Sequence, residues 1–394
     1  MVGEKKVLGQ GSGERVTMRR FFVRFGVFLF VFGLIFSGCA GVSARGERAS
    51  AEANVFDVLD HLIFSLMDEL GIVGVSLAVI HNERLVYVKT YGYSDKELAI
   101  PVRITDLFRI ASISKLITQM AILQLAAEGL LDFEDRVFGE GSILGLSFGE
   151  PGRYVSDITV RHLLEFSTGS TSALLHGVSV EGMARTDLSM PPGSHHVYCN
   201  TSYSTLGRII EKLSGYSYEE YVRKYVLLPI GITNMAIFGN ERKPGEVVHY
   251  TASGNPARRF IPGTHNPSDA TGGWIASATD LARVFVRVSQ TDTDFRLSQS
   301  AAAAAGLANL PPFGKSSWVF TGGMIGTRAV MHKLNSETAY VLLWNTSPEA
   351  EAAIILAKME NAILNISDWP SHCLFPTSPW ACGRSESALK ICEK

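Results

Sequence analysis

The hydrophobic positions of this chain recur at two different spacings, which predict helices in some stretches and strands in others. Residues 108–129 carry apolar side chains three and four positions apart, and apolar side chains also fill the other helical faces. We therefore expect a buried central helix that begins at Ser112 and is capped near Gly129. Residues 73–80 and 85–91 are rich in β-branched side chains, and their separation by four polar residues predicts a hairpin.

The remaining periodicity predicts strands near both ends of the chain and helices between them. Further helices are expected at residues 55–70, 160–166, 204–214, 218–227, 276–288 and 349–364. Further strands are expected at residues 317–321, 328–333 and 338–344. This order favours an α/β fold, in which helices flank one antiparallel sheet built from both chain ends. We expect an α/β lobe of about residues 55–105 and 275–367 and an inserted helical lobe of about 106–274, each with its own core.

The first 38 residues have the pattern of an export signal. Two arginines precede a twelve-residue apolar run at residues 25–36, which is too short to span a bilayer as a mature helix. The Phe-Ser-Gly-Cys that follows resembles the lipobox of bacterial lipoproteins, so Cys39 is the expected lipid anchor and residues 39–54 a tether. The lipobox phenylalanine departs from the usual leucine, and cleavage after Ala44 is the alternative. Either reading predicts export across the inner membrane, and the lipobox predicts a lipoprotein of the cell envelope.

Charge narrows the expected partners. Without residues 1–38 the chain keeps 30 of its 36 basic and 36 of its 38 acidic residues, a net charge of −6. That balance argues against nucleic acid as a partner and suits an exported protein. The ten histidines are scattered, no spacing resembles a zinc site, and the adjacent His195 and His196 are interpreted as polar loop residues.

The cysteines do not define one disulfide. Cys199 stands alone, whereas a short carboxy-terminal tail, residues 368–394, holds Cys373, Cys382 and Cys392. Export permits a disulfide in this tail, but three cysteines leave one over and the pairing stays open.

A serine and a lysine, Ser112 and Lys115, lie three positions apart where the central helix is expected to begin. Positions i and i+3 share one helical face, so the lysine amine can reach the serine hydroxyl. Backbone N–H groups and the positive end of the helix dipole would stabilise an alkoxide and an oxyanion there. The motif alone is weak, because about one or two copies occur by chance in a chain of this length, and Ser112 could serve only as a helix cap.

A second motif, Tyr198-Cys199-Asn200, follows a Pro-Pro-Gly break and is expected on a loop facing a cleft. We expect a nearby lysine ammonium to make the Tyr198 phenol more acidic, so that it can take or relay the proton of the serine. We expect Asn200 to hold Lys115 and to bind an amide oxygen of the substrate.

A third motif, Phe320-Thr321-Gly322-Gly323, lies at the end of a predicted strand. Its glycines would let a substrate approach the backbone closely. The N–H of Gly323 could then join that of Ser112 as the two donors of an oxyanion hole. These four residues are therefore candidate substrate-binding residues.

The order Ser-x-x-Lys, Tyr-x-Asn and x-Thr-Gly-Gly resembles that of the class C β-lactamase and penicillin-binding serine hydrolase family, which includes D-amino peptidases and esterases. The resemblance covers about residues 55–365, and stretches such as Thr271-Gly272-Gly273 support it. It implies a β-lactamase/transpeptidase-like fold, with Ser112 as nucleophile and Lys115 and Tyr198 as its acid and base partners. It also implies acyl-enzyme chemistry that uses no metal or other cofactor.

One position departs from that family. Phe320 stands where the family usually has a lysine or histidine, the group expected to meet a substrate carboxylate. Lys315 lies five residues away, which is not an equivalent placement. Neutral esters or amides are therefore favoured over β-lactams and peptidyl-D-alanines.

A competing nucleophile motif is rejected. Residues 145–149 match the Gly-x-Ser-x-Gly elbow of α/β-hydrolases around Ser147. That elbow needs a strand before it and a helix after it, whereas Glu150-Pro151-Gly152 follows here directly.

Together these observations predict a lipid-anchored serine hydrolase that cleaves an ester or amide bond of a small-molecule or peptide substrate through an acyl-Ser112 intermediate. β-Lactamase and D,D-peptidase activities are the alternatives within the class. A non-catalytic envelope binding protein on the same fold is the alternative outside it. The intact serine, lysine, tyrosine and asparagine argue against that last reading, whereas Phe320 and the bulky Cys199 favour it mildly.

Overall fold

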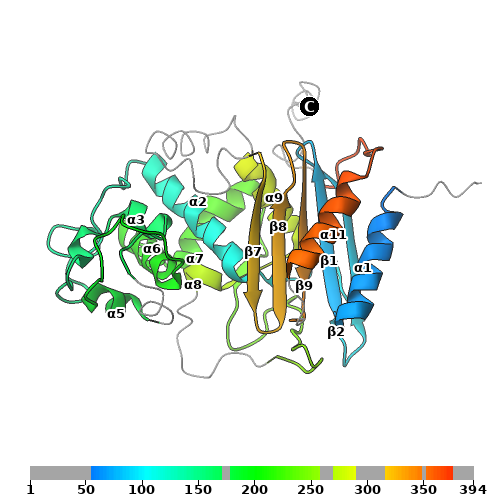
Figure 1. Cartoon of the computed structure of the whole chain (residues 1–394), viewed down its shortest axis with the longest axis horizontal. Helices are drawn as coiled ribbons and strands as arrows, with labels where there is room; N and C mark the ends of the chain where they lie inside the picture. Colours follow the sequence, from blue (N-terminus) through cyan, green and yellow to red (C-terminus); the bar gives the residue numbers. More distant parts are fainter. Residues whose placement is uncertain (1–54, 171–177, 258–268, 290–315, 348–351, 376–394) are drawn as a thin grey trace, which may run out of the picture. The chain divides into compact units, whose positions relative to one another are not determined.

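A sheet of six strands joins the two ends of the chain in the computed structural model, which describes residues 55–170, 178–257, 269–289, 316–347 and 352–375. The strand order is β3-β2-β1-β9-β8-β7, and the pairings are antiparallel. The predicted α/β fold with a sheet built from both chain ends is confirmed (Figure 1). The strands are β1 (Gly74–His81), β2 (Arg84–Asp95), β3 (Ile100–Pro101), β7 (Trp318–Met324), β8 (Thr327–Lys333) and β9 (Thr338–Trp344).

The pairing of β1 with β9 closes the sheet between segments that are far apart in sequence. Ala78 lies opposite Val341 in this ladder. Side chains alternate between the two faces of β1, so that Val75 and Leu77 enter one core while Ala78 enters the other. Because both faces are covered, β1 and β9 are buried almost throughout, which explains their nearly continuous apolar sequences.

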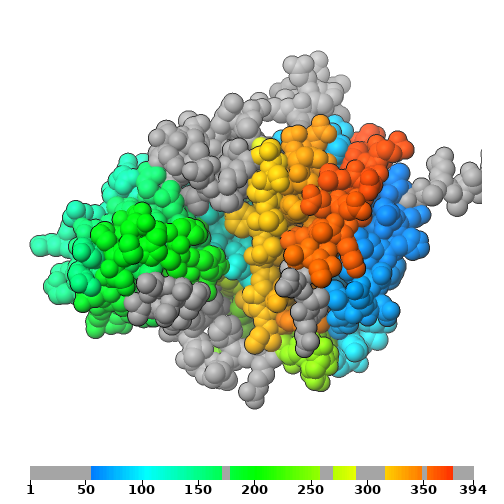
Figure 2. Space-filling model, in the orientation of Figure 1, coloured from blue at the N-terminus to red at the C-terminus, as the bar shows by residue number. Residues whose placement is uncertain are grey.

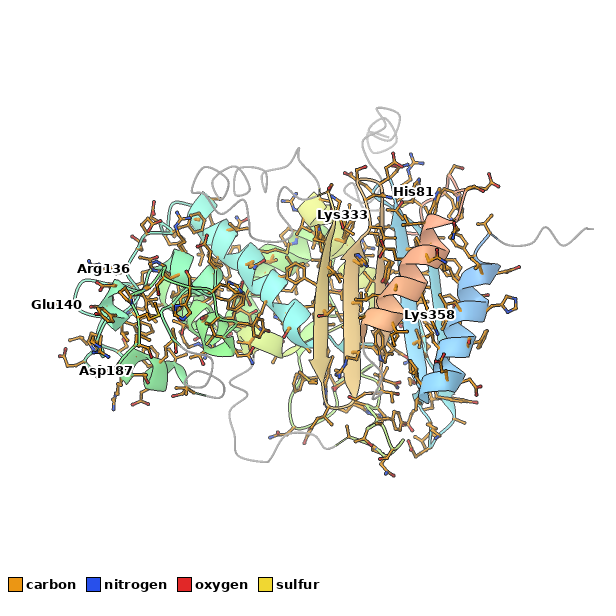
Figure 3. The ribbon with its side chains drawn as sticks, in the orientation of Figure 1. His81, Arg136, Glu140, Asp187, Lys333 and Lys358 are labelled. Carbon is orange, nitrogen blue, oxygen red and sulfur yellow. The ribbon has the colours of Figure 1, made fainter. Side chains whose placement is uncertain are left out.

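Two helices cover one face of the sheet. They are α1 (Asp57–Leu70) and α11 (Ala352–Leu364), which lie side by side across the strands (Figure 1). Both helices are close to their predicted ranges. Lys358 on α11, labelled in Figure 3, pairs with Glu69 on α1 at 3.1 Å. The predicted start of α11 at residue 349 lies outside the described residues.

The other face of the sheet packs on α2 (Ser114–Ala127) and α9 (Ala278–Ser289). The same core continues without interruption into the helical part, from Val341 through Leu123 to Met183. The expectation of a separate core for each lobe is therefore wrong. The buried helix α2 presents apolar side chains all round and so joins the two parts.

The helical part follows α2 in the chain. Arg136, Glu140 and Asp187 mark its end farthest from the sheet (Figure 3). The predicted helix at 218–227 continues beyond α7 as a wider π-type turn. The elements are η2 (Val155–Asp157), α3 (Val160–Leu164), α5 (Val180–Arg185), α6 (Asn200–Ser214), α7 (Tyr218–Tyr221), η3 (Val222–Leu227) and η4 (Leu228–Ile230).

A second, small sheet was not predicted from the sequence. It has the order β4-β6-β5, and β4 comes shortly before the central helix in sequence, whereas β5 and β6 come long after it. Its strands contain two or three residues each, which is too short for a periodic signal. Its elements are β4 (Phe108–Arg109), β5 (Ala236–Ile237) and β6 (Trp274–Ala276), with the short helix α8 (Asp269–Gly272) ahead of β6.

The start of α9 and the carboxy-terminal tail show two local features, a helix cap and a disulfide bond. The start of α9 is capped, because Ser277 Oγ accepts the Asp280 N–H at 3.1 Å and Asp280 accepts the Ser277 N–H at 3.2 Å. Cys373 is in a disulfide bond whose partner lies outside the described residues, as do the export signal, Cys39, the tether and Lys315. In the described part of the chain, no helix is both long enough and apolar enough to cross a bilayer.

Candidate active site

Ser112 lies in a tight 3-10 turn, η1 (Ala111–Ile113), directly ahead of α2. The prediction that an α-helix begins at Ser112 is wrong by two residues. The Ile113 N–H bonds to Ile110 O at 3.1 Å, which tightens the turn, and Ser114 Oγ accepts the Trp274 N–H at 3.2 Å. Ala111 adopts a left-handed φ of 46°, an unfavourable conformation for a residue with a side chain. The surrounding strands therefore hold Ser112 in a fixed, strained turn.

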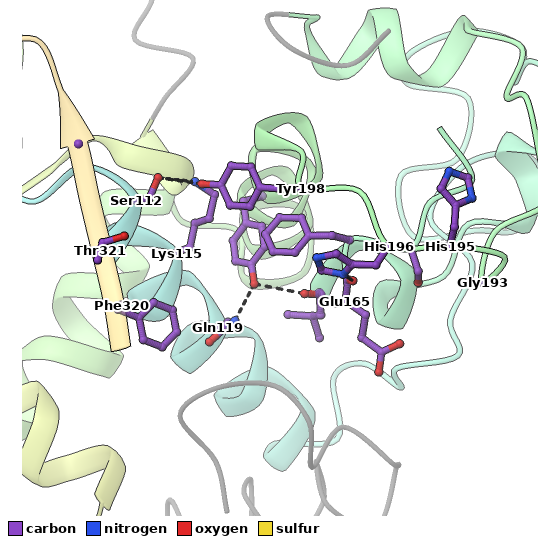
Figure 4. Close-up of a pocket in the computed structure, with 15 residues that line it drawn as sticks. Ser112, Lys115, Gln119, Glu165, Gly193, His195, His196, Tyr198, Phe320 and Thr321 are labelled. Atoms are coloured by element: carbon purple, nitrogen blue, oxygen red, sulfur yellow. Dashed lines mark hydrogen bonds between the residues drawn. The ribbon is translucent and has the colours of Figure 1, made fainter. Parts of the chain in front are cut away.

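The structure brings Lys115 and Tyr198 to the Ser112 hydroxyl. Lys115 Nζ lies 3.2 Å from Ser112 Oγ, and Tyr198 OH lies 2.8 Å from the same oxygen. The amine also donates to the Thr271 carbonyl at 2.8 Å and lies 4.9 Å from the centre of the Tyr198 ring. Figure 4 shows the three side chains converging from η1, α2 and the loop ahead of α6. The predicted contact between Lys115 and Ser112 across one turn is present.

Burial changes the proton affinities of these groups. Lys115 is only 3% exposed, and desolvation of its ammonium form lowers the pKa of Lys115 to about 7. Partial burial raises the pKa of Tyr198 above its ordinary value, although its bond to Ser112 acts in the opposite direction. The expectation of a more acidic Tyr198 is therefore wrong, because desolvation by burial is the largest cause of its pKa shift. Near pH 7 the amine is therefore about half in its neutral form, beside a protonated phenol.

Strand β7 forms the wall opposite the helical part. Phe320, Thr321 and Gly323 line the pocket next to Ser112, and β7 is the last strand of the described sheet. An edge strand has backbone groups without a neighbouring strand on one side, so Gly323 is placed to offer its N–H beside that of Ser112. Gly322 is buried instead, and a Cβ there would lie 2.0 Å from Ile110 O. Gly322 therefore permits close packing of β7 on the Ser112 turn and does not line the pocket.

The pocket has a volume of about 780 Å³ and lies between β7, α2 and the helical part. In Figure 2 the cyan surface of α2 is visible between the green helical segments and the gold strand β7. Sequence reasoning missed Gln119, which lies seven residues after Ser112 on the same helical face, a spacing that could have indicated it. The lining residues are Ser112, Lys115, Gln119, Leu164, Glu165, Phe166, Ser167, Gly193, His195, His196, Tyr198, Tyr203, Phe320, Thr321 and Gly323.

Comparison with known proteins identifies the family. The family model described as Beta-lactamase matches residues 59–359, most of the chain. The chain belongs to the beta-lactamase family. Penicillin-binding protein 4* of Bacillus subtilis is 28% identical over 181 residues, which are 42% of this chain and 38% of that protein. The match thus spans less than half the length of that curated relative.

Solved structures of other proteins share the fold. A class C beta-lactamase superposes with a TM-score of 0.66 at 17% identity, covering 82% of this chain and 99% of that one. EstCE1, described as a hydrolase with promiscuous acyltransferase activity, superposes with a TM-score of 0.62 at 18% identity, covering 78% and 98% of the two chains. The chain therefore has the fold of the serine hydrolases of this superfamily.

The Tyr-x-Asn motif is only partly arranged as the family resemblance implied. Asn200 is the first residue of α6, is exposed, and is not among the described residues that line the pocket. Cys199 instead turns its thiol into the core ahead of α6, with an extended backbone at φ −143°. Cys199 is thus buried, whereas the next residue, Asn200, is exposed at the start of α6. The predicted contact of Asn200 with Lys115 is not observed.

Phe320, the departure from the family pattern, is a fixed part of the pocket wall. It is half-buried and its ring meets that of Trp318 edge-on, with centroids 5.6 Å apart. His195 and His196, interpreted from the sequence as polar loop residues, also line the pocket. Both rings bond to backbone carbonyls, His195 to Ser170 at 3.0 Å and His196 to Glu165 at 2.8 Å.

The alternative nucleophile is not placed for catalysis. Ser147 is exposed, lies within consecutive turns, and is not among the described residues that line the pocket. No strand precedes it and no helix follows it directly in this described segment, so rejection of the Gly-x-Ser-x-Gly reading is confirmed. Across the described ranges, no cluster of three His, Cys, Asp or Glu side chains is arranged to hold a metal ion.

Proposed function

We propose that this member of the beta-lactamase family hydrolyses esters or amides of neutral acyl groups through an acyl-Ser112 intermediate. The observation that carries the proposal is the amine of Lys115, with a pKa of about 7, at 3.2 Å from Ser112 Oγ. A neutral amine in that position can accept the proton of the serine hydroxyl as attack begins. A lysine with an ordinary pKa would be protonated near pH 7 and could not accept this proton.

The proposed reaction proceeds in two halves. Ser112 Oγ attacks the substrate carbonyl while its proton passes to Lys115, and the N–H groups of Ser112 and Gly323 stabilise the oxyanion. Tyr198, which lies 2.8 Å from Ser112 Oγ, relays that proton to the leaving group. A water molecule then attacks the acyl carbon, gives its proton back through the same groups, and releases the acid and the free serine.

The preference for neutral acyl groups rests on the wall that faces the substrate. Phe320 offers an apolar ring where the family usually supplies a cation. A substrate carboxylate placed there would lose hydration without gaining an ion pair, which costs several kcal/mol. The fold shared with the hydrolase EstCE1 is consistent with ester substrates. The similarity to penicillin-binding protein 4* favours the alternative, β-lactamase or D,D-peptidase activity.

A labelling assay with a fluorophosphonate tests the proposal and separates it from a non-catalytic binding protein. The full chain should become covalently labelled, and prior incubation with benzylpenicillin should leave most of the labelling intact. Absence of labelling would contradict a serine hydrolase of any kind. Complete protection by benzylpenicillin would favour the penicillin-directed alternative over neutral esters.

We also propose attachment to the cell envelope through Cys39. The apolar run at residues 25–36 and the Phe-Ser-Gly-Cys sequence after it support this proposal. Cells grown with a labelled fatty acid should incorporate it into the wild-type protein and not into Cys39→Ser. A wild-type protein that carries no label and begins at Arg45 would contradict the anchor.

A further inference from the structure

The floor of the pocket contains a side-chain amide whose orientation is fixed by its neighbours. Gln119 Nε2 donates to Tyr203 OH at 2.6 Å, and that hydroxyl donates to the Leu164 carbonyl at 3.4 Å. A backbone carbonyl can only accept, so the single proton of the Tyr203 hydroxyl serves Leu164 and its oxygen accepts from Gln119. This order places the nitrogen of the Gln119 amide toward Tyr203 and its oxygen away from it.

The amide oxygen of Gln119 has no hydrogen-bond partner among the described residues. Gln119 is only 3% exposed, yet it lines the pocket. Figure 4 shows it below Lys115, on the side of the pocket toward Phe320. A second polar atom of the lining, Ser167 Oγ, is also buried and without a partner in the described structure. Buried polar groups normally have partners, so these two atoms indicate a place where a ligand group or water completes the bonding.

The distance between Ser112 and Gln119 sets the length of the acyl chain that can reach the Gln119 amide. Gln119 follows Ser112 by seven residues along nearly continuous helix, which corresponds to about 10 Å at about 1.5 Å per residue. The space between them is bounded by apolar or aromatic side chains, including Leu164, Phe166 and Phe320. The ring of Phe166 also packs 5.0 Å from that of Tyr203, which fixes this wall. An acyl chain directed along this wall reaches the acceptor on Gln119 at its far end.

We propose that this floor is an acyl subsite for a medium-length neutral chain that carries a hydrogen-bond donor, a hydroxyl or an amide N–H, at its distal end. The inference rests on the proposed function, because it assigns the acyl side of an acyl-Ser112 intermediate. A chain ending in a methyl group leaves Gln119 Oε1 unpaired, whereas a chain ending in a hydroxyl donates a hydrogen bond to it. Sites built around a buried polar group discriminate strongly against analogues that cannot pair with it.

The test compares two p-nitrophenyl esters of equal length, ω-hydroxyoctanoate and nonanoate, by their kcat/KM values. Wild-type enzyme should prefer the hydroxyl-ended ester by about tenfold, although the methyl-ended ester is the more hydrophobic. Gln119→Met keeps the length of the side chain and removes the acceptor, so it should reverse the preference. A wild-type preference for the nonanoate, or a ratio within about twofold of wild type in Gln119→Met, would overturn the proposal.

Two further variants make the result specific. Ser202 Oγ is also buried without a partner in the described structure, but Ser202 is not among the pocket-lining residues. Ser202→Ala should therefore keep the wild-type ratio of the two esters, and a reversal there would overturn the assignment to Gln119. If Gln119→Met does not fold, Gln119→Glu keeps an acceptor and should raise the ratio of the ω-amino ester to the ω-hydroxy ester. No change in that second ratio would also overturn the proposal.

The acetate ester separates this inference from the proposed function. Its acyl group is too short to reach Gln119, so its hydrolysis reports only on Ser112 and the groups around it. Suppose that the acetate is hydrolysed by the wild type and not by Ser112→Ala, and that Gln119→Met leaves the ratio of the long esters unchanged. This result would reject the subsite and support the proposed hydrolase activity. No turnover of any ester and no labelling of Ser112 would reject both.

Discussion

Lys115 Nζ lies 3.2 Å from Ser112 Oγ, and its only other hydrogen bond in the described structure is to the carbonyl of Thr271 at 2.8 Å. That carbonyl belongs to α8, which packs against α2, so the amine is held from both sides. Because no carboxylate accompanies it in these contacts, burial dominates and lowers the pKa of Lys115 to about 7. In the structure the amine donates to Ser112 Oγ, and in its neutral form it can instead accept the proton of that hydroxyl.

The pKa of Lys115 predicts the acid side of the pH profile. A base must be deprotonated to act, so kcat/KM for a neutral ester should rise with pH through about 7 and then level off. The raised pKa of Tyr198 keeps its phenol protonated, so no decline should occur below about pH 10. Initial rates with an ester substrate from pH 5 to pH 11 test both the rise through about pH 7 and the absence of a decline below about pH 10. A profile that is flat between pH 5 and pH 9 would remove Lys115 as the base.

Removal of the Tyr198 hydroxyl should slow the reaction while leaving substrate binding nearly unchanged. Tyr198→Phe loses the group that lies 2.8 Å from Ser112 Oγ, and kcat should fall by about two to four orders of magnitude, the usual scale for a proton-transfer group. Tyr216→Phe is a matched control, because Tyr216 donates no group to the pocket and lies beside Lys224 on the surface. Undiminished kcat in Tyr198→Phe would show that the phenol is dispensable.

Gly322 should be required for the position of the Ser112 turn. A Cβ at this residue would lie 2.0 Å from Ile110 O, so Gly322→Ala must displace β7 or the turn. We expect a loss of about 1–3 kcal/mol in the free energy of unfolding, typical of overpacking, with a fall in kcat. Gly239→Ala is the control, because a Cβ there meets nothing within 4 Å. Equal unfolding midpoints in denaturant for the two variants would contradict this close packing.

Phe320 should control the choice between neutral and anionic substrates. Phe320→His places a group that can carry a positive charge at the pocket wall, so the ratio of kcat/KM for benzylpenicillin to that for a neutral ester should rise about tenfold, mainly through a lower KM. Phe320→Leu keeps the wall apolar and should leave the ratio near that of wild type. If wild-type enzyme already hydrolyses benzylpenicillin better than any neutral ester, another group supplies the charge, with His195 as the first candidate.

Sequence patterns predicted the longer elements and failed for the short ones. The helix α1 and the strands β1, β2, β8 and β9 have enough residues to show a period, and they were placed within a few positions. The two-residue strand β4 and the turn η1 depend on partners at Trp274 and Ile275 that are distant in sequence. The sequence therefore predicted an α-helix that begins at Ser112, whereas α2 begins two residues later, at Ser114.

The sequence predicted which residues form the candidate site better than it predicted their orientation and their pKa shifts. Motif spacing indicated Ser112, Lys115 and Tyr198, which lie together. It could not indicate that Asn200 is exposed while Cys199 is buried, because burial depends on elements that are distant in sequence. The direction of the Tyr198 pKa shift was also beyond the sequence, since desolvation depends on every element packed around the pocket.

The most direct test of the account is the identity of the residue that a fluorophosphonate modifies. The wild-type protein, Ser112→Ala and Ser147→Ala should be labelled under identical conditions, digested, and mapped by mass spectrometry. The account predicts a single adduct on Ser112, undiminished in Ser147→Ala and absent in Ser112→Ala. An adduct on any other serine, or equal labelling of wild type and Ser112→Ala, would contradict it.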